Sequence, residues 1–226
     1  MTFQAPESLS EQIAQHLGHR IVTRELEPGV RVQELKVAGD LNVSRGAVRE
    51  ALLILKRRHL VDIFPRRGAV VSSLTVASVN NLYDVYINLL CMLARKVLER
   101  WASDELGGVL SRVREVEAVI QALNSTGPDA AERVIDAGFG VVRYAYGLVE
   151  NPFLEETLEN FRPAISRTCF LALENFQEGI DETAVFFQRL GAAAQSGDAK
   201  CLQSAIQAFG EYQRQQVLST LMEESA

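Results

Sequence analysis

The chain has 226 residues, 47% of them hydrophobic and 23% charged, and it contains no run of about 18 uncharged apolar residues, so a membrane span is not expected. Its first residues lack the basic start and apolar core of a signal peptide, so the expected location is the cytoplasm. The net charge of −6 hides an asymmetry, because residues 1–75 carry 11 Lys/Arg against 8 Asp/Glu, while residues 76–226 carry 12 against 21. The asymmetry predicts a DNA-binding domain of residues 1–75 joined to a second domain of residues 76–226.

Two helices and a turn are predicted before residue 42. Apolar residues recur every four positions over residues 8–23, which predicts an amphipathic helix. Pro28-Gly29 predicts a turn, and residues 34–41 follow as a short second helix. The chain must then reverse direction at Asn42, a residue type that tolerates the left-handed backbone region.

The stretch NVSRGAVREALLIL, from position 42 to 55, is predicted to form a third helix with two distinct faces. Ser44 is a good N-cap, and Arg45 and Arg49 lie four residues apart near the leading end. A DNA recognition helix needs such a pair, because arginine bonds O6 and N7 of guanine or a phosphate. An ordinary amphipathic helix with two solvated arginines is the alternative. The apolar face comprises Ala47, Val48, Ala51, Leu52 and Leu55.

Residues 59–74 change from helical to strand-like periodicity. Two runs rich in apolar and β-branched residues flank a turn, which predicts a β-hairpin. Its tip carries Arg66 and Arg67 beside Gly68, and a tip of this kind approaches the DNA backbone or the minor groove. A solvated basic hairpin is the alternative, but a hairpin directly after a helix-turn-helix is typical of a winged helix.

The remainder is predicted to be an all-helical bundle of about six helices, so the protein as a whole is mostly α. The helix boundaries follow Ser, Thr, Asn, Asp, Gly and Pro residues at the breaks between apolar periodic segments. The predicted helices span residues 76–102, 104–124, 128–149, 152–174, 180–196 and 198–222.

The segment PGVRVQELKVAGDLNVSRGAVREALLILKRRHLVDIFPRRGAVV resembles the DNA-binding domain of GntR-type bacterial transcription regulators. The family pattern P-G-x-R-L-x-E-x-x-L-A-x-x-L-G-V-S-R-x-x-V-R-E-A-L-x-x-L matches from Pro28 to Leu55, and the P-x-R-G of the wing matches from Pro65 to Gly68. The usual Thr-Pro after Ser-Arg is replaced by Gly46-Ala47, which removes a hydroxyl and alters the expected operator preference. By this resemblance, the DNA contacts fall on Arg31, Ser44, Arg45, Gly46, Arg49, Arg66, Arg67 and Gly68.

The order of a winged helix and then six helices resembles the FCD branch of this family, also called the FadR subfamily. The shared pieces are short: Asp136-x-x-Phe139 and Asn151-Pro152-x-Leu154. This resemblance implies that residues 76–226 bind an effector and form the dimer.

Many FCD domains hold a metal ion with one Asp and three His residues, a ligand set that suits Zn and its neighbours. The resemblance places Asp136 at the Asp position, but the His positions fall on Gly140 or Val142, on Phe187 and on Phe209. Because residues 76–226 contain no histidine at all, neither a metal site of this kind nor any other cofactor is expected.

Two interpretations of the altered interior remain open. In the first, the aromatic residues fill the space and the domain has no ligand. In the second, they surround an apolar pocket for a small organic effector, apolar or carboxylate-bearing, with an arginine pairing with its acidic group. Arg143 is the preferred arginine, with Arg95 or Arg167 as alternatives. The predicted effector pocket is formed by Tyr86, Arg143, Tyr144, Phe187 and Phe209, with Tyr146 as a further wall.

The sequence therefore predicts a homodimeric transcription regulator that binds a two-fold double-stranded DNA operator, with repression as the commoner mode in such families. The alternative is a regulator without an effector, controlled by a partner protein or by its own abundance. An enzyme is not expected, because the bundle lacks histidine, a nucleophile motif and a glycine-rich phosphate loop. Cys91, Cys169 and Cys201 are predicted to be buried free thiols.

Overall fold

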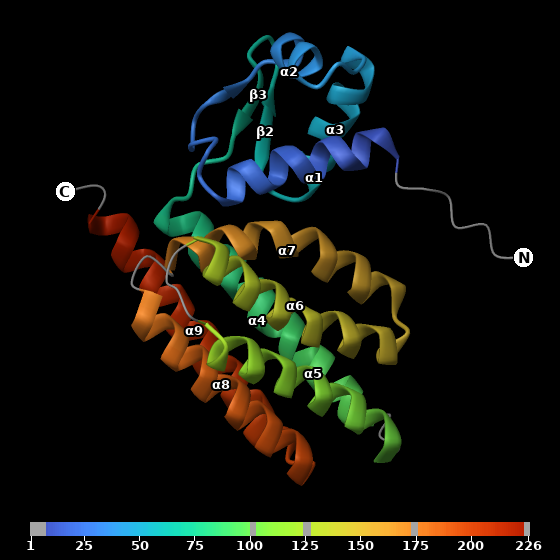
Figure 1. Ribbon diagram of the computed structural model, residues 1–226, viewed down its shortest axis with the longest axis vertical. Helices are drawn as coiled ribbons and strands as arrows, with labels where there is room; N and C mark the ends of the chain where they lie inside the picture. The colour runs from blue at the N-terminus through green and yellow to red at the C-terminus, as the bar shows by residue number, and fades with distance from the viewer. Residues whose placement is uncertain (1–7, 100–102, 124–127, 173–175, 224–226) are drawn as a thin grey trace, which may run out of the picture. The chain divides into compact units, whose positions relative to one another are not determined.

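A computed structural model of the chain describes residues 8–99, 103–123, 128–172 and 176–223. The contacts divide the chain into two compact units, one of Met1–Leu74 with Asn160–Arg167 and the other of Thr75–Glu159 with Thr168–Ala226. The prediction of a mostly α protein, with a winged helix-turn-helix followed by a helical bundle, is confirmed (Figure 1). The elements are α1 (Leu9–Val22), β1 (Arg31–Val32), α2 (Glu34–Asp40), α3 (Arg45–Arg57), β2 (Val61–Phe64), β3 (Gly68–Val71), α4 (Val76–Glu99), α5 (Ser103–Gln121), α6 (Pro128–Val149), α7 (Pro152–Ala172), α8 (Phe176–Ser196) and α9 (Ala199–Glu223).

Helices α1 and α3 each begin at a serine cap. The Ser8 hydroxyl accepts from the backbone N–H of Glu11 at the start of α1, and Ser44 does the same for Ala47 at the start of α3. Asn42, in the turn between α2 and α3, has a φ of 52°, the left-handed conformation that the reversal of the chain requires. The predicted helix-turn-helix is therefore present.

An apolar cluster lies beneath α3 in the first unit. The helix turns its predicted apolar face inward, and Val48, Ala51 and Leu55 have no exposed surface. They pack in one cluster with residues of α1 and with strand residues such as Val61 and Val71. Burial of this face fixes which side of α3 remains in solvent.

The wing belongs to a three-stranded antiparallel sheet in the order β1-β3-β2. The predicted hairpin is β2 and β3, with Phe64 paired to Gly68 next to the turn. The third strand, β1, was not predicted: Arg31 pairs with Val70, and Val32 with Ala69. Two residues are too few to show an alternating pattern, so only the pairing with a distant strand defines this element.

Two polar links fix α1 against the solvent side of α3. The Ser10 hydroxyl donates to the Glu50 carboxylate at 2.7 Å, and Arg58, which follows α3, pairs with Glu11. Neither pair involves Arg45 or Arg49 at the leading end of α3.

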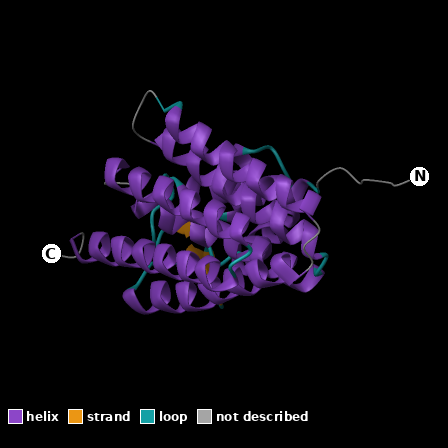
Figure 2. Cartoon of the chain, turned by 90° about the horizontal axis from the view of Figure 1, so that it is seen from below, coloured by secondary structure: helices purple, strands orange, loops and turns teal. Residues whose placement is uncertain are grey.

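The second unit contains six helices among its described residues, as predicted (Figures 1 and 2). α4 packs along α9 and also against α6, while α5 packs on α6 and α8, and α8 packs on α9. The predicted helix start at residue 180 is wrong, because α8 begins at Phe176 and continues through Gly179, whose carbonyl accepts from the Thr183 hydroxyl at 2.7 Å. Across the described ranges, no helix combines the length and apolarity that crossing a bilayer demands.

The prediction for the cysteines holds at one position only. Cys169 is buried, whereas Cys91 is half-buried and Cys201 is exposed. Cys201 lies in the first turn of α9, where its N–H donates to the capping carboxylate of Asp198 and the side chain faces solvent. Apolar neighbours in the sequence therefore did not predict whether a cysteine side chain is buried.

Candidate nucleic-acid interface

The leading end of α3 presents two arginines to solvent. The side chains of Arg45 and Arg49 are 57% and 65% exposed, on the opposite side of the helix from the buried Val48 and Leu52. Ser44, at the N-cap, and Gly46 are exposed beside them. The first turns of α3 thus combine guanidinium donors with a backbone held firmly by the core, the arrangement that major-groove recognition requires.

Glu34, in the first turn of α2, contacts both arginines of α3. Its Oε2 lies 3.1 Å from Nη2 of Arg49 and 3.8 Å from Nη2 of Arg45. No role was predicted for Glu34 from the sequence, although it occupies the Glu position of the quoted family pattern, three residues after Arg31. The family pattern includes a glutamate at this position, but it does not indicate the contact with Arg49, which is 15 residues away in the chain.

The wing carries the second group of cations. Arg66 and Arg67 are exposed at the turn, and Arg66 adopts a φ of 65°. Gly68 has a φ of 79°, and a Cβ atom at that position would lie 3.7 Å from Nε and Nη2 of Arg31. Arg31 of β1 therefore lies beside the wing turn, which brings three of the predicted DNA-contact arginines together around one exposed hairpin.

All eight predicted DNA-contact residues thus fall into two groups on the first unit. One group is the start of α3, and the other is the wing turn with β1. Phe64, 45% exposed next to the turn, is an additional exposed aromatic side chain that was not singled out. Its pairing opposite Gly68 gives it this position.

Comparison with known proteins supports this interpretation of the first unit. Residues 9–71 match the family described as bacterial regulatory proteins, gntR family. Over these residues the chain is similar to that family. The match covers α1 to β3, which are the elements that carry both groups of exposed arginines.

Curated relatives match part of the chain. A gluconate operon transcriptional repressor of Bacillus licheniformis is 34% identical over 112 residues, half of this chain and 45% of the relative. The HTH-type transcriptional repressor RspR of Escherichia coli K12 is 34% identical over 88 residues, 39% of each chain. This chain thus spans less than half the length of these two relatives.

Two solved structures share the fold over nearly the whole chain. E. coli McbR/YncC superposes with a TM-score of 0.73 at 19% identity, covering 98% of this chain and all of that one. A putative GntR regulator from Rhodococcus sp. RHA1 superposes with a TM-score of 0.67 at 19% identity, covering 94% and 99%. At this identity the similarity establishes that the gntR-type domain is followed by the same kind of helical domain.

The predicted effector residues of the helical domain are distributed over more than one cluster. Phe187 is 6% exposed and packs in one core cluster with Tyr144. The Phe186 ring stacks on Phe209 with centroids 4.1 Å apart and meets Phe187 edge-on at 4.9 Å. The Phe186 ring therefore joins the rings of Phe187 and Phe209. The Tyr144 side chain lies where a Cβ of Gly108 would be.

Tyr86 lies in a different, polar environment on α4. Burial, together with the nearby Cys169 thiol and the Glu159 carboxylate, raises its pKa well above the usual value. One turn earlier, the buried Tyr83 hydroxyl is 3.0 Å from the hydroxyl of Thr168 on α7. Burial also raises the pKa of Cys169 to about 12, so this thiol stays protonated at neutral pH.

The wall residue Tyr146 adjoins this environment from α6. Its hydroxyl donates to the Glu159 carboxylate of α7, and burial together with that carboxylate raises the tyrosine pKa. Buried hydroxyls from α4 and α6 thus face α7. Tyr86 and Tyr146 therefore lie in surroundings more polar than those of the phenylalanine rings.

The three candidate arginines differ in position. Arg143 is exposed, as is Arg95, which pairs with Glu99 one turn on. Arg167 is 3% exposed and belongs to the first unit, where its Nη1 donates to the carbonyl and hydroxyl oxygens of Ser72. Burial, with the charge of Arg24, lowers its pKa to about 10, and its Nη2 has no partner in the described part of the chain.

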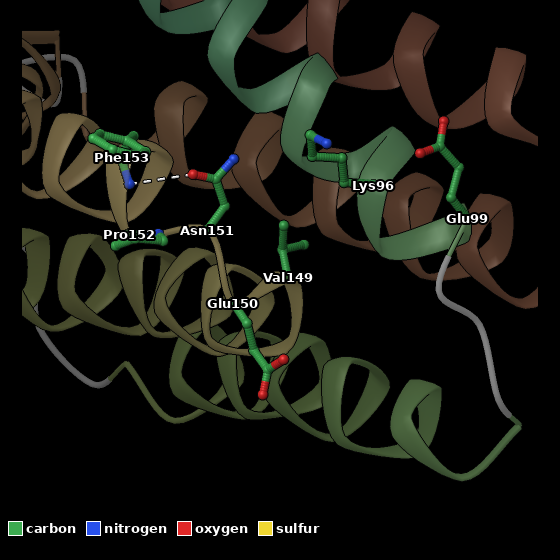
Figure 3. A pocket seen from close by; sticks show the side chains of 7 residues that line it. All are labelled: Lys96, Glu99, Val149, Glu150, Asn151, Pro152 and Phe153. Carbon is green, nitrogen blue, oxygen red and sulfur yellow. Dashed lines mark hydrogen bonds between the residues drawn. The ribbon is translucent and has the colours of Figure 1, made fainter.

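An open hollow of about 360 Å³ lies near the end of α4, away from the predicted pocket residues (Figure 3). Asn151 forms part of its wall, and its side-chain oxygen accepts from the backbone N–H groups of Phe153 and Leu154, so this amide caps α7. The wall mixes one ammonium group, two carboxylates and an aromatic ring. The lining residues are Lys96, Glu99, Val149, Glu150, Asn151, Pro152 and Phe153.

Of the positions that the resemblance to FCD domains assigns to metal ligands, only the Asp position keeps a ligand side chain. Asp136 is exposed on α6, and Gly140, Val142, Phe187 and Phe209 offer no ligand atom in their side chains. Within the described ranges, no three His, Cys, Asp or Glu side chains are grouped as a metal site would require.

Proposed function

We propose that the chain is a homodimeric, cytoplasmic transcription regulator that binds a two-fold DNA operator through its gntR-type domains. The exposure of Arg45 and Arg49 on the leading turns of α3, opposite a fully buried apolar face, carries this proposal. Two such helices related by a two-fold axis would reach half-sites about one helical turn apart, and the wing arginines would contact the flanking backbone.

Repression is the proposed sign of regulation. The relatives that this chain matches include proteins named as repressors. A protein that occupies an operator overlapping a promoter blocks transcription without any further activity. Repression therefore requires no function of the chain other than DNA binding.

The helical domain is the proposed dimerisation and effector-binding domain, as the resemblance to the FCD branch implies. An effector would act only if it bound the DNA-competent and DNA-incompetent arrangements with different affinities. The proposed ligand is a small organic molecule, apolar or carboxylate-bearing, bound without a metal near Tyr86, Tyr144, Phe187 and Phe209. Arg143 would be available to an acidic group only at the surface, because its side chain is exposed.

A regulator without its own effector is the second candidate. The direct ring contacts among Phe186, Phe187 and Phe209 favour it, because rings 4.1 and 4.9 Å apart leave no space for a ligand between them. In that case a partner protein or the abundance of the regulator would set its occupancy on DNA.

Selection of duplexes from a random library by the purified chain tests the DNA-binding proposal. Enrichment of an inverted repeat, bound by a species of twice the chain mass in light scattering, is the expected result. Recovery of no common sequence would overturn it.

Native mass spectrometry separates the two regulatory candidates. A dimer with a few hundred additional daltons would establish an organic ligand and give its mass. A bare dimer whose mass and melting temperature do not change across a panel of organic acids and acyl thioesters would favour the filled interior.

A further inference from the structure

Glu34 is the one carboxylate that the described residues place against the arginines of α3. Its Oε2 faces Nη2 of Arg49 at 3.1 Å and Nη2 of Arg45 at 3.8 Å, and the carboxylate is 27% exposed. The pair with Arg49 joins the first turn of α2 to the face of α3 that points away from the core. A negative charge thus lies within the surface assigned to DNA.

The contact contributes little to stability. Both arginines are more than half exposed, and ion pairs between exposed side chains add little to the free energy of unfolding. The fold already secures α3 through its buried face and through the links from α1 at Ser10 and Glu11. The main effect of Glu34 is therefore on how Arg45 and Arg49 bind a ligand.

From this geometry we infer that Glu34 is a positioning residue that sets the discrimination between operator and random DNA. It holds the Arg49 guanidinium through Nη2, while the Nε and Nη1 groups have no partner within the described ranges and stay available for a base edge. A guanidinium held in one orientation loses less freedom when it forms a bidentate contact with guanine.

The same carboxylate penalises binding that uses only charge. A phosphate that approaches Arg45 or Arg49 must compete with Glu34 and is repelled by it, so the two arginines offer random DNA less net positive charge than their number suggests. Base-specific contact keeps its advantage, because it uses the direction of the guanidinium and not only its charge. This inference rests on the proposed DNA-binding function and names Glu34 as a residue that increases its sequence specificity.

The test compares E34Q with D40N, measuring affinity for two 30-base-pair duplexes across a salt series. One duplex is selected by the wild-type chain from a random library, and the other is a scrambled sequence of the same composition. Asp40 is an exposed carboxylate at the end of the same helix, in no recorded ion pair within the described residues, so D40N makes the same change in net charge away from the arginines.

For E34Q we expect affinity for the scrambled duplex to rise about fivefold at 0.15 M salt, with a salt slope steeper by about 0.9, since one more phosphate is neutralised. Affinity for the selected duplex should stay equal or fall, so the discrimination ratio drops fivefold or more. D40N should leave the ratio within twofold of wild type. E34D, which keeps the charge, should bind the scrambled duplex as the wild type does.

The outcomes separate the inference from the function on which it rests. If the wild type selects no sequence, both the proposed function and this inference are overturned. If the wild type selects a sequence but E34Q and D40N change the ratio equally, or E34D behaves as E34Q does, then Glu34 does not set discrimination and the inference alone is overturned. Melting curves of all variants verify that each is folded.

Discussion

Gly210 of α9 and Ile87 of α4 lie so close that the helices would have no space for another atom between them. A Cβ atom on Gly210 would be 2.5 Å from Cγ1 of Ile87, well inside van der Waals contact. α4 and α9 pack along each other in the helical domain, so this glycine sets how closely the pair approaches.

Replacing Gly210 by alanine should therefore destabilise the helical domain, although alanine is the better helix former. The methyl group forces Ile87 or one helix to move, and overpacking of this kind costs about 1–3 kcal/mol. Chemical denaturation measures the change. The control is G147A on α6, where nothing lies within 4 Å, so it should be neutral or stabilising. Equal effects of the two variants would show that the close contact is absent.

Replacing Arg66 and Arg67 with alanine should weaken binding to selected and scrambled DNA by the same factor. Exposed wing arginines that contact phosphates carry no sequence information, and each lost contact should reduce the salt slope by about 0.9. Fluorescence anisotropy across a salt series gives both quantities. A loss confined to the selected duplex would instead assign these residues to base recognition.

The thiols should react in an order set by their surroundings. Cys201 is exposed and should be alkylated in the native protein, whereas Cys169, with a pKa raised to about 12 by burial, should react only after unfolding. The hydrogen bond and charge of Asp198 raise the pKa of Cys201, so its rate should increase as the pH rises above 8. D198N keeps a cap for α9 but removes the charge, and it should make Cys201 react faster at pH 8; an unchanged rate would show that the carboxylate does not act on the thiol.

Local patterns predicted the first domain well. The periodic apolar face of α3, its Ser44 cap and the reversal at Asn42 each depend on residues close in the chain, and all three are present. What failed depends on distant partners. The strand β1 forms only because Arg31 and Val32 pair with β3. The contact of Glu34 is with Arg49, 15 residues later in the chain.

The helical domain was predicted as a set of helices but not as a site. The helix count follows from caps and breaks, whereas the neighbours of each aromatic ring depend on how helices far apart in the chain pack. Phe187 and Phe209 were predicted to line one pocket, and both rings contact Phe186. Tyr86 lies instead near the Cys169 thiol and the Glu159 carboxylate, neighbours that the sequence did not indicate. Periodicity predicts which face of a helix is buried, but it does not predict which other helix packs against that face.

The most direct test of DNA recognition by α3 is the affinity of R49A for the selected duplex, compared with R57A. Arg57 is exposed at the other end of the same helix, so its removal changes the charge equally without touching the leading turns. A lost bidentate contact with guanine costs about 1–3 kcal/mol, so R49A should bind about 10- to 100-fold more weakly, while R57A stays within threefold of wild type. If both variants bind as the wild type does, α3 is not the recognition helix.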